Sequence, residues 1–312
     1  MYIGIDIGGT KCAVVKGQKC ENGEMKVISK IRFETLGFKE TFEKIIKAVD
    51  ELMPCERIGI SCGGPLDEGK GVILSPPNLP GWDEVHITDI LRERFGVPVK
   101  LCNDANACAL AEWKFGAGNG SKNMVFMTFG TGLGAGLILD GKLYSGTNGM
   151  AGEAGHVRLD ANGPVGYGKA GSFEGFCSGG GIAKLAKSYA KEALAMGRVA
   201  FSCKTDSEIE EITTKRIADL AKTGDKDAIE IFNRSAKRLG MGLSIIIDIL
   251  NPERIVLGGI YTRCEELFNA EMYAVLKSEA LSESLAVCKI LPAALGESIG
   301  DIAALAVADS ID

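Results

Sequence analysis

The residues from Asp6 to Lys11 have the types and spacing needed to bind a phosphate together with a metal ion. An apolar run ends at Asp6 and is followed by Gly8, Gly9, Thr10 and Lys11. Phosphoryl transfer uses a carboxylate to hold Mg²⁺, directly or through water, and uses N–H and hydroxyl donors for the phosphate oxygens. Asp6 and Thr10 fit these roles, and Lys11 supplies a neutralising charge. The alternative is that Asp6 only caps the turn.

A second glycine-rich turn lies 124 residues further along the chain. Glycine stands at every other position from 130 to 136, after an apolar run over 124–128. Glycine leaves backbone N–H groups unshielded and allows tight turns, as a phosphate-binding loop requires. Gly8 and Gly132 are 124 residues apart, and so are Gly17 and Gly141. This repeat predicts an internally duplicated fold that grips one phosphorylated ligand between its halves, with two unrelated hairpins as the alternative.

Asp104 is the candidate for a catalytic base. It follows a strand-like apolar run over 97–101 and stands, with Asn103, directly before a helical pattern over 105–115. In an α/β sheet, an active-site carboxylate is expected at the carboxyl end of a strand. Asp104 could accept the proton of a substrate hydroxyl, and Asn103 could orient the substrate through its amide group. The alternative is that both residues only cap the helix, since Asn and Asp are common N-caps.

Glu153, His156 and Glu174 are polar side chains within a glycine-rich segment. Sugar hydroxyls both donate and accept hydrogen bonds, so carboxylates and an imidazole suit a sugar-binding site. The chain has only two histidines, and the other one, His86, receives no role. A structural histidine with satisfied hydrogen bonds is the alternative for His156.

The segments that must position these residues alternate between strands and helices. Residues 2–34 predict a three-stranded antiparallel meander with glycine turns. Further patterns follow in the order helix 40–52, strand 57–61, helix 87–95, strand 97–101 and helix 105–115. Strands that alternate with helices in this way predict an α/β sheet.

The second half of the chain is dominated by helical patterns. These predict helices over 181–195, 214–222 and 225–250, a strand over 254–257 before Gly258-Gly259, a strand near 286–291 and a helix near 298–309. The small polar run 116–123 is the predicted domain boundary. We predict an N-terminal α/β domain over 1–117, completed by the C-terminal helix at about 298–312, and a C-terminal α/β domain with helical insertions over 118–297.

The composition excludes several classes of protein. A net charge of −6 without long charged runs argues against a nucleic-acid surface, which is normally basic. No apolar stretch reaches the about 18 residues of a membrane helix, and Asp6 interrupts the place of a signal peptide's apolar region. The ten cysteines include no CxxC pair, which favours reduced, buried thiols. These features predict a cytoplasmic protein with no nucleic-acid or membrane partner.

Taken together, seven motifs resemble those of the ROK family of sugar kinases and sugar-sensing repressors, within the actin/hexokinase superfamily. They are IGIDIGGTK (3–11), GGP (63–65), NLPGW (78–82), CNDANACALAEW (102–113), FGTGLGAG (129–136), AGEAGH (151–156) and PERIVLGG (252–259). The resemblance spans nearly the whole chain. It implies a duplicated ATPase fold, actin-like and ribonuclease H-like, in which two α/β domains flank a cleft. Members are commonly dimers or tetramers, so we expect a homodimer or homotetramer.

The resemblance implies roles at the positions that match the family's motifs. Asp6 would organise the Mg²⁺ that accompanies ATP, directly or through water, and Asp104 would be the general base. The ATP-binding residues would be Asp6, Gly8, Gly9, Thr10, Lys11, Gly130, Thr131 and Gly132 at the phosphates, and Gly258 and Gly259 at the adenosine. The sugar would contact Gly64, Asn78, Asn103, Glu153, His156 and Glu174. The first motif begins at residue 3, so the DNA-binding extension of the repressors is not expected.

The chain departs from the family's pattern at one place. Many members hold a structural zinc with the histidine of the GH motif and three cysteines arranged CxCGxxGCxE. Here Val165, Tyr167 and Ser172 stand in the three cysteine places, and Cys177 cannot form a four-ligand site alone. We predict no zinc site, and a loop held instead by packing of residues such as Val165, Tyr167, Phe173 and Phe176.

The leading function is an ATP-dependent hexose kinase that phosphorylates a sugar hydroxyl, foremost the 6-hydroxyl of glucose, with Asp104 as general base. A β-glucoside, N-acetylmannosamine, fructose or allose is the alternative substrate. A non-catalytic sugar sensor is a function of a different class, although it would not need complete phosphate loops. A glycosidase that uses Glu153 and Glu174 is a third reading, but it leaves both glycine hairpins without a role.

Overall fold

The computed structural model describes residues 1–311, which divide by their contacts into two compact units. Unit 1 contains Met1–Phe126, Gly136–Gly152 and residues 293–311, and unit 2 contains Met127–Ala135 and Glu153–Pro292. The domain boundary predicted after residue 117 stays a prediction. By contacts, residues 118–126 and 136–152 group with unit 1, as do the last residues of the chain.

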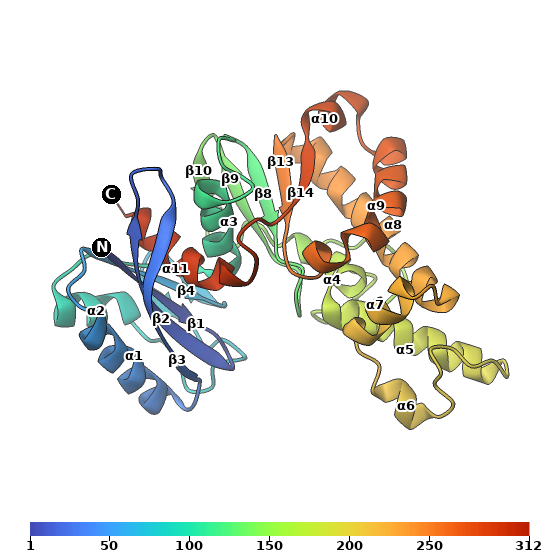
Figure 1. Cartoon of the computed structure of the whole chain (residues 1–312), viewed down its shortest axis with the longest axis horizontal. Helices are drawn as coiled ribbons and strands as arrows, with labels where there is room; N and C mark the ends of the chain where they lie inside the picture. The colour runs from blue at the N-terminus through green and yellow to red at the C-terminus, as the bar shows by residue number, and fades with distance from the viewer. Residues whose placement is uncertain (312) are drawn as a thin grey trace. The chain divides into compact units, whose positions relative to one another are not determined.

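A five-stranded sheet forms the centre of unit 1 (Figure 1). Its strands are β1 (Tyr2–Ile7), β2 (Lys11–Lys19), β3 (Met25–Glu34), β4 (Arg57–Cys62) and β7 (Val99–Asn103), in the order β3-β2-β1-β4-β7. The first three strands form the predicted antiparallel meander, and β1, β4 and β7 run parallel. The parallel strands therefore end at the same edge of the sheet, where Asp6 pairs with Ser61 and Cys62 pairs with Asn103.

Four helices of the described chain contact this sheet, and the last of them packs where the sequence supplies glycine. They are α1 (Phe38–Leu52), α2 (Ile87–Phe95), α3 (Asp104–Phe115) and α11 (Ile299–Asp309). A short hairpin of β5 (Leu66–Asp67) and β6 (Val72–Ile73) lies in the chain between β4 and α2. A Cβ on Gly4 of β1 would lie 2.8 Å from the Cβ of Ala304 in α11. A Cβ on Gly59 of β4 would overlap the backbone of Ala304 and Ala308. The two glycines therefore let α11 lie directly on β1 and β4.

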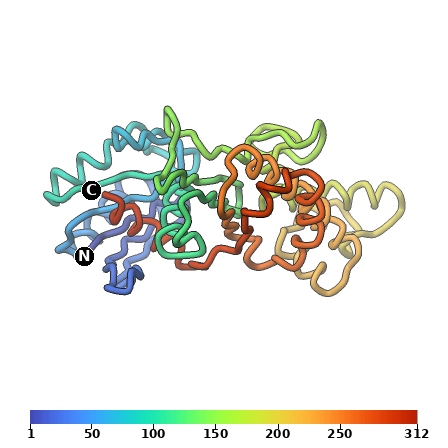
Figure 2. Tube along the Cα trace, turned by 90° about the horizontal axis from the view of Figure 1, so that it is seen from above, coloured from blue at the N-terminus to red at the C-terminus, as the bar shows by residue number. Residues whose placement is uncertain are grey.

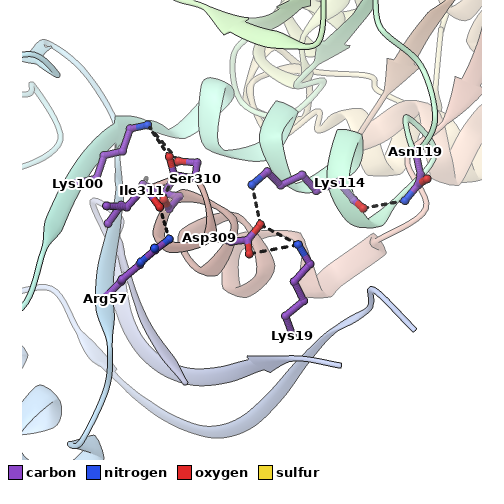
Figure 3. A network of polar contacts seen from close by, with 9 residues as sticks. Lys19, Arg57, Lys100, Lys114, Asn119, Asp309, Ser310 and Ile311 are labelled. Atoms are coloured by element: carbon purple, nitrogen blue, oxygen red, sulfur yellow. Dashed lines mark hydrogen bonds and ion pairs between the residues drawn. The ribbon is translucent and has the colours of Figure 1, made fainter. Parts of the chain in front are cut away.

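Both ends of the described chain belong to unit 1 (Figure 2). The N-terminal amino group of Met1 pairs with Glu56, and the Arg57 guanidinium donates to the carbonyl of Ile311. Figure 3 shows how the end of α11 is held: Lys19 and Lys114 bind the Asp309 carboxylate. The last residues of the chain are thus tied to strands and a helix from its first third.

A second five-stranded sheet repeats the order of the first. It consists of β8 (Met124–Met127), β9 (Ala135–Leu139), β10 (Lys142–Tyr144), β13 (Arg254–Leu257) and β14 (Lys289–Pro292), in the order β10-β9-β8-β13-β14. An antiparallel β9–β10 pair and a parallel β13–β14 pair occupy the places of β2–β3 and β4–β7. The mixed α/β fold with an internal duplication, predicted from the spacing of the glycine turns, is confirmed.

Most of unit 2 is helical. Its helices are α4 (Phe173–Cys177), α5 (Gly179–Ala195), α6 (Asp206–Glu210), α7 (Thr214–Lys222), α8 (Lys226–Leu250), α9 (Ile260–Glu279) and α10 (Ser282–Val287). It also contains the 3₁₀ turn η1 (Ala154–His156) and a small hairpin of β11 (Val165–Gly166) and β12 (Lys169–Ala170). The sequence patterns predicted α5, α7 and α8 but missed α9 and α10. No helix within residues 1–311 combines the length and the apolar composition needed to cross a membrane.

Candidate active site

The turn between β1 and β2 is tightly constrained by its neighbours. The Gly8 N–H donates to the Lys11 carbonyl at 3.2 Å, which closes the turn. A Cβ on Gly9 would lie 2.7 Å from the Cβ of Asn78 and 2.8 Å from its carbonyl oxygen, so only glycine fits there. Asn78, predicted to approach the sugar, therefore packs against the predicted phosphate turn, beside the exposed Thr10.

Thr35 fixes this turn from behind and was not identified from the sequence. Its hydroxyl donates to the Gly8 carbonyl at 2.6 Å, and its N–H donates to the Thr10 carbonyl at 3.0 Å. The Cys12 thiol lies 3.3 Å from the same hydroxyl. The carbonyls of Gly8 and Thr10 are thus engaged by Thr35. The N–H groups of Gly9 and Thr10 are then the candidate donors for an anion.

Asp6 lies at the end of β1 in a region of negative charge. Burial, together with the nearby carboxylates of Asp301 and Asp104, raises the pKa of Asp6 to about 6 against the opposing charges of Lys30 and Arg32. Lys30 is itself paired with Asp301 at 2.6 Å. A carboxylate whose ionised form is destabilised by neighbouring carboxylates favours a bound cation.

This donor set fits Mg²⁺ in one particular way. No group of three or more His, Cys, Asp or Glu side chains within residues 1–311 could enclose a metal ion. Mg²⁺ in phosphotransferases is held by one or two carboxylates together with the phosphates of the substrate and water, and needs no such cage. Asp6 beside a phosphate-binding turn meets that requirement.

Asp104 begins α3, and its two carboxylate oxygens differ in their surroundings. The Ala105 N–H donates to Oδ1 of Asp104 at 2.8 Å and to Oδ1 of Asn103 at 3.0 Å. Asn103 is the N-cap of the helix, and Oδ2 of Asp104 accepts no hydrogen bond from another residue among residues 1–311. Nearby protein atoms restrict the hydration of this carboxylate and raise the pKa of Asp104, although the side chain keeps access to solvent. Both properties suit a general base.

Asn103 lies beside Gly64, as the resemblance requires. An added Cβ on Gly64 would be 3.6 Å from Nδ2 of Asn103. Gly63 is likewise close to Asp104, with 3.8 Å from its would-be Cβ to Oδ2. The ends of β4 and β7 therefore bring the GGP and CNDA motifs together.

Glu68 supports this corner of unit 1 and was also missed by the sequence analysis. Its Oε1 accepts from the Asn103 N–H at 2.8 Å and from Nδ2 of the buried Asn106 at 3.1 Å. Its Oε2 accepts from the Ser145 hydroxyl at 3.1 Å. One carboxylate thus joins three segments that are distant in sequence, and no local pattern marks it.

The second glycine-rich turn follows β8 in unit 2. Thr128 closes it through its N–H to the Gly134 carbonyl at 2.9 Å and through its hydroxyl, which accepts from the Gly134 N–H at 2.8 Å. Inside the turn, the Gly130 N–H donates to the Gly132 carbonyl, and the Gly179 N–H at the start of α5 donates to the Gly130 carbonyl at 2.7 Å. Thr131 remains exposed at the tip.

The GG pair after β13 lies against this turn. The Gly258 N–H donates to Met127, and Gly259 has a φ of +61° and no room for a Cβ beside the Phe129 carbonyl. Only glycine meets both demands. The structure therefore brings Gly259, with Gly258 before it, next to Gly130, and all three are residues predicted to bind ATP.

The three predicted sugar-binding residues of unit 2 lie on η1 and α4. Glu153 is exposed immediately before η1, and His156 ends it. Glu174 is the second residue of α4, and its Oε2 accepts from the Leu133 N–H at 3.1 Å. The His156 ring meets the edge of Tyr167 with 5.4 Å between centroids.

The loop between His156 and α4 is held only in part by the packing that the sequence analysis predicted. Phe173 and Phe176 are buried and the Phe176 ring lies against Gly163 of the loop, whereas Val165 and Tyr167 are exposed, Tyr167 by 78%. Basic side chains supply further contacts to the loop. Arg158 donates to Ala170, Lys169 to His156 and Lys184 to Val165, each to a backbone carbonyl at 2.7 Å, and Arg238 pairs with Asp160.

Comparison with known proteins identifies the family. The ROK family model matches residues 2–311. A glucokinase of Thermotoga maritima is 30% identical, covering 98% of this chain and 96% of that protein. The crystal structure of a ROK hexokinase from Thermus thermophilus has a TM-score of 0.79 at 29% identity, covering 99% of this chain and 97% of that one. A ROK family glucokinase from Streptomyces griseus, in complex with glucose and AMPPNP, has a TM-score of 0.76 at 31% identity, covering 99% of each chain.

Equivalent sheets with matching glycine-rich turns define a duplicated ATPase of the actin-like fold. Within that fold class, the chain belongs to the ROK family.

Proposed function

We propose that this protein is an ATP-dependent hexose kinase that transfers the γ-phosphate of ATP to a sugar hydroxyl, foremost the 6-hydroxyl of glucose. The observation that carries the proposal is the pair of carboxylates at the carboxyl ends of β1 and β7. Asp6 lies beside a phosphate-binding turn, and Asp104 keeps one oxygen available under a raised pKa. The similarity to glucokinases and to a ROK hexokinase supports it.

Asp104 acts as the general base in this mechanism. Its Oδ1 is held by the Ala105 N–H, which fixes the side chain while Oδ2 accepts the proton of the attacking sugar hydroxyl. The raised pKa of Asp104, caused by burial of the carboxylate, makes it a stronger base than an ordinary aspartate. Asn103 and Gly64 contact the sugar beside it.

The nucleotide is bound by the two glycine-rich turns and the GG pair. N–H groups at Gly9 and Thr10, with the Lys11 charge, bind phosphate oxygens, as do those at Thr131 and Gly132. Gly8 and Gly130 close the two turns through their own N–H groups and let the phosphates approach the backbone. Gly258 and Gly259 lie against the adenosine. Asp6 holds Mg²⁺, which supplies charge stabilisation for the transferred phosphoryl group. Glu153, His156 and Glu174 hold sugar hydroxyls, and Asn78 lies at the edge of the sugar position.

The further parts of the proposal concern the protein's state in the cell. All ten cysteines are free thiols among the described residues, which fits a reducing compartment such as the cytoplasm. We expect a homodimer or homotetramer, which sedimentation analysis would measure directly.

The test is ADP release from ATP–Mg²⁺ across a panel of hexoses, N-acetylhexosamines and β-glucosides. Asp104→Asn should lower kcat on the best sugar by about 10²- to 10⁴-fold, the usual contribution of a general base. Asp89→Asn is the matched control, because Asp89 is an exposed aspartate of α2 that pairs only with Arg92 at 2.8 Å. Sugar binding without turnover on any panel member would overturn the kinase assignment and favour a sugar sensor.

A further inference from the structure

The Glu174 side chain connects two functional segments of unit 2. Its Oε2 accepts from the Leu133 N–H at 3.1 Å, and Leu133 directly follows Thr131 and Gly132 of the second phosphate turn. Oε1 receives no hydrogen bond from any residue between 1 and 311. One oxygen of a predicted sugar-binding carboxylate is therefore engaged by the nucleotide-binding turn, and the other is available.

Two glycines leave room for this arrangement. A Cβ on Gly132 would lie 2.8 Å from Oε2 of Glu174, so any larger residue there would displace the carboxylate. A Cβ on Gly155, in the middle of η1, would overlap the Leu133 carbonyl and lie 3.4 Å from the Cβ of Glu174. The phosphate turn, η1 with Glu153 and His156 at its ends, and the first turn of α4 thus meet around one side chain.

The Ser172 cap makes Glu174 a rigid connection. The Ser172 hydroxyl accepts from the Gly175 N–H at 3.1 Å and is itself buried, which fixes the start of α4. The backbone of Glu174 therefore lies between Ser172, which caps the helix, and Gly175, whose N–H is capped, so the freedom left to Glu174 is in its side-chain torsions. A ligand that fixes those torsions also fixes the position of the Leu133 N–H.

We propose that Glu174 is a positioning residue that couples sugar binding to nucleotide binding. This inference rests on the proposed function. A sugar hydroxyl that donates to Oε1 holds the carboxylate in the orientation whose Oε2 receives the Leu133 N–H. The turn from Gly130 to Leu133 is then ordered before the nucleotide arrives. A nucleotide that binds to an already ordered turn loses less conformational entropy and therefore binds more tightly. The coupling is thus positive, and by linkage it is reciprocal.

The first test measures the affinity for AMPPNP–Mg²⁺ by calorimetry in the absence of sugar. Glu174→Ala removes the acceptor of the Leu133 N–H and should weaken binding by about five- to tenfold, the lower part of the range for coupled sites. Glu174→Gln keeps an oxygen acceptor and should lose less. Glu211→Gln is the matched control. Glu211 is an exposed glutamate directly after α6 and has no part in the proposed sugar or nucleotide binding, so nucleotide affinity should not change.

The second test repeats the titration in the presence of the sugar that is phosphorylated fastest in the panel. In the wild-type protein, saturating sugar should tighten AMPPNP–Mg²⁺ binding by at least about fivefold. In Glu174→Ala, at sugar concentrations that saturate the variant, this ratio should fall to about one. In Glu211→Gln the ratio should equal that of the wild-type protein.

The outcomes separate the inference from the function on which it rests. A wild-type protein that binds sugar and AMPPNP independently, or a Glu174→Ala variant with wild-type nucleotide affinity and coupling, overturns the positioning role while the kinase assignment stands. A wild-type protein that does not bind AMPPNP–Mg²⁺ at all refutes the proposed function and the inference together.

Discussion

Glu112, in the last turn of α3, allows a quantitative prediction of stability. It is completely buried, and its carboxylate accepts three backbone N–H groups. Oε2 receives those of Ala117 at 2.8 Å and Ala294 at 3.1 Å, and Oε1 receives that of Leu295 at 2.9 Å. The carboxylate therefore fastens the segment after β14 to α3, directly before the chain enters α11.

Glu112→Ala would leave all three donors without their acceptor. Each buried group that loses its partner costs about 1–3 kcal/mol, so complete desolvation would cost about 3–9 kcal/mol in the free energy of unfolding. Water that enters the vacated space reduces this, and we expect a loss of about 3–5 kcal/mol. Glu112→Gln retains one carbonyl oxygen and sets an amide N–H₂ against the remaining donors, so its loss should be smaller, about 1–3 kcal/mol.

The assay is urea unfolding followed by tryptophan fluorescence. The two tryptophans, Trp82 and Trp113, both lie in unit 1, so the signal reports the unit that contains Glu112. A lower midpoint with an unchanged slope would show a loss of stability rather than a change in the unfolded state. Glu93→Ala, at an exposed position of α2, is the control and should change little. A loss below about 1 kcal/mol for Glu112→Ala would refute the reasoning, because three orphaned donors cannot cost so little.

Four further predictions concern the first phosphate turn and the sheet beneath it. Because the pKa of Asp6 is raised to about 6, kcat/KM for ATP–Mg²⁺ should fall as the pH drops below about 6, where protonated Asp6 no longer attracts the cation. The folded state binds that proton more tightly than the unfolded state, so Asp6→Asn should stabilise the protein above pH 6, as urea unfolding at about pH 8 would show. Thr35→Val removes the hydroxyl that donates to Gly8 and should raise KM for ATP by about two- to tenfold, whereas Thr35→Ser should not; an equal effect of both variants would refute the clamp. Gly59→Ala should destabilise unit 1 by about 1–3 kcal/mol or more through overlap with α11, whereas Gly37→Ala, with no atom within 4 Å of the added Cβ, should be nearly neutral in the same unfolding assay.

Local patterns predicted the helices that pack on the core with one face. Helices α1, α2 and α8 are of this kind, so their apolar residues recur with the helical period. The meander of β1 to β3 was predicted from apolar runs separated by glycine turns. Helix α9 was missed although its buried residues recur at helical spacing along one face: Tyr261, Cys264, Phe268, Met272 and Leu276. The helix departs from helical geometry at Cys264, which interrupts the pattern near its start.

The sequence analysis identified candidate site residues where reactive side chains stand beside a glycine-rich turn. It missed residues that support the site by binding groups far away in the sequence. The turns at Gly8 and Gly132 have a spacing that can be read from the sequence. Glu68, Thr35 and Glu112 do not, because each binds backbone or side-chain groups that are 27 to 183 residues away. The run 116–123 looked like a linker because it is small and polar, but Glu112 and the Trp113 indole hold its backbone in place.

The contact of α11 with β1 and β4 has a consequence for the order of events during synthesis. A ribosome releases the chain from its N-terminus, so the strands that carry Gly4 and Gly59 emerge long before Ala304 does. Until then the face of the first sheet that α11 contacts exposes apolar surface. Nascent chains of this protein should therefore recruit holdase chaperones until α11 has been synthesised, and unit 2 should acquire protease resistance before unit 1 does.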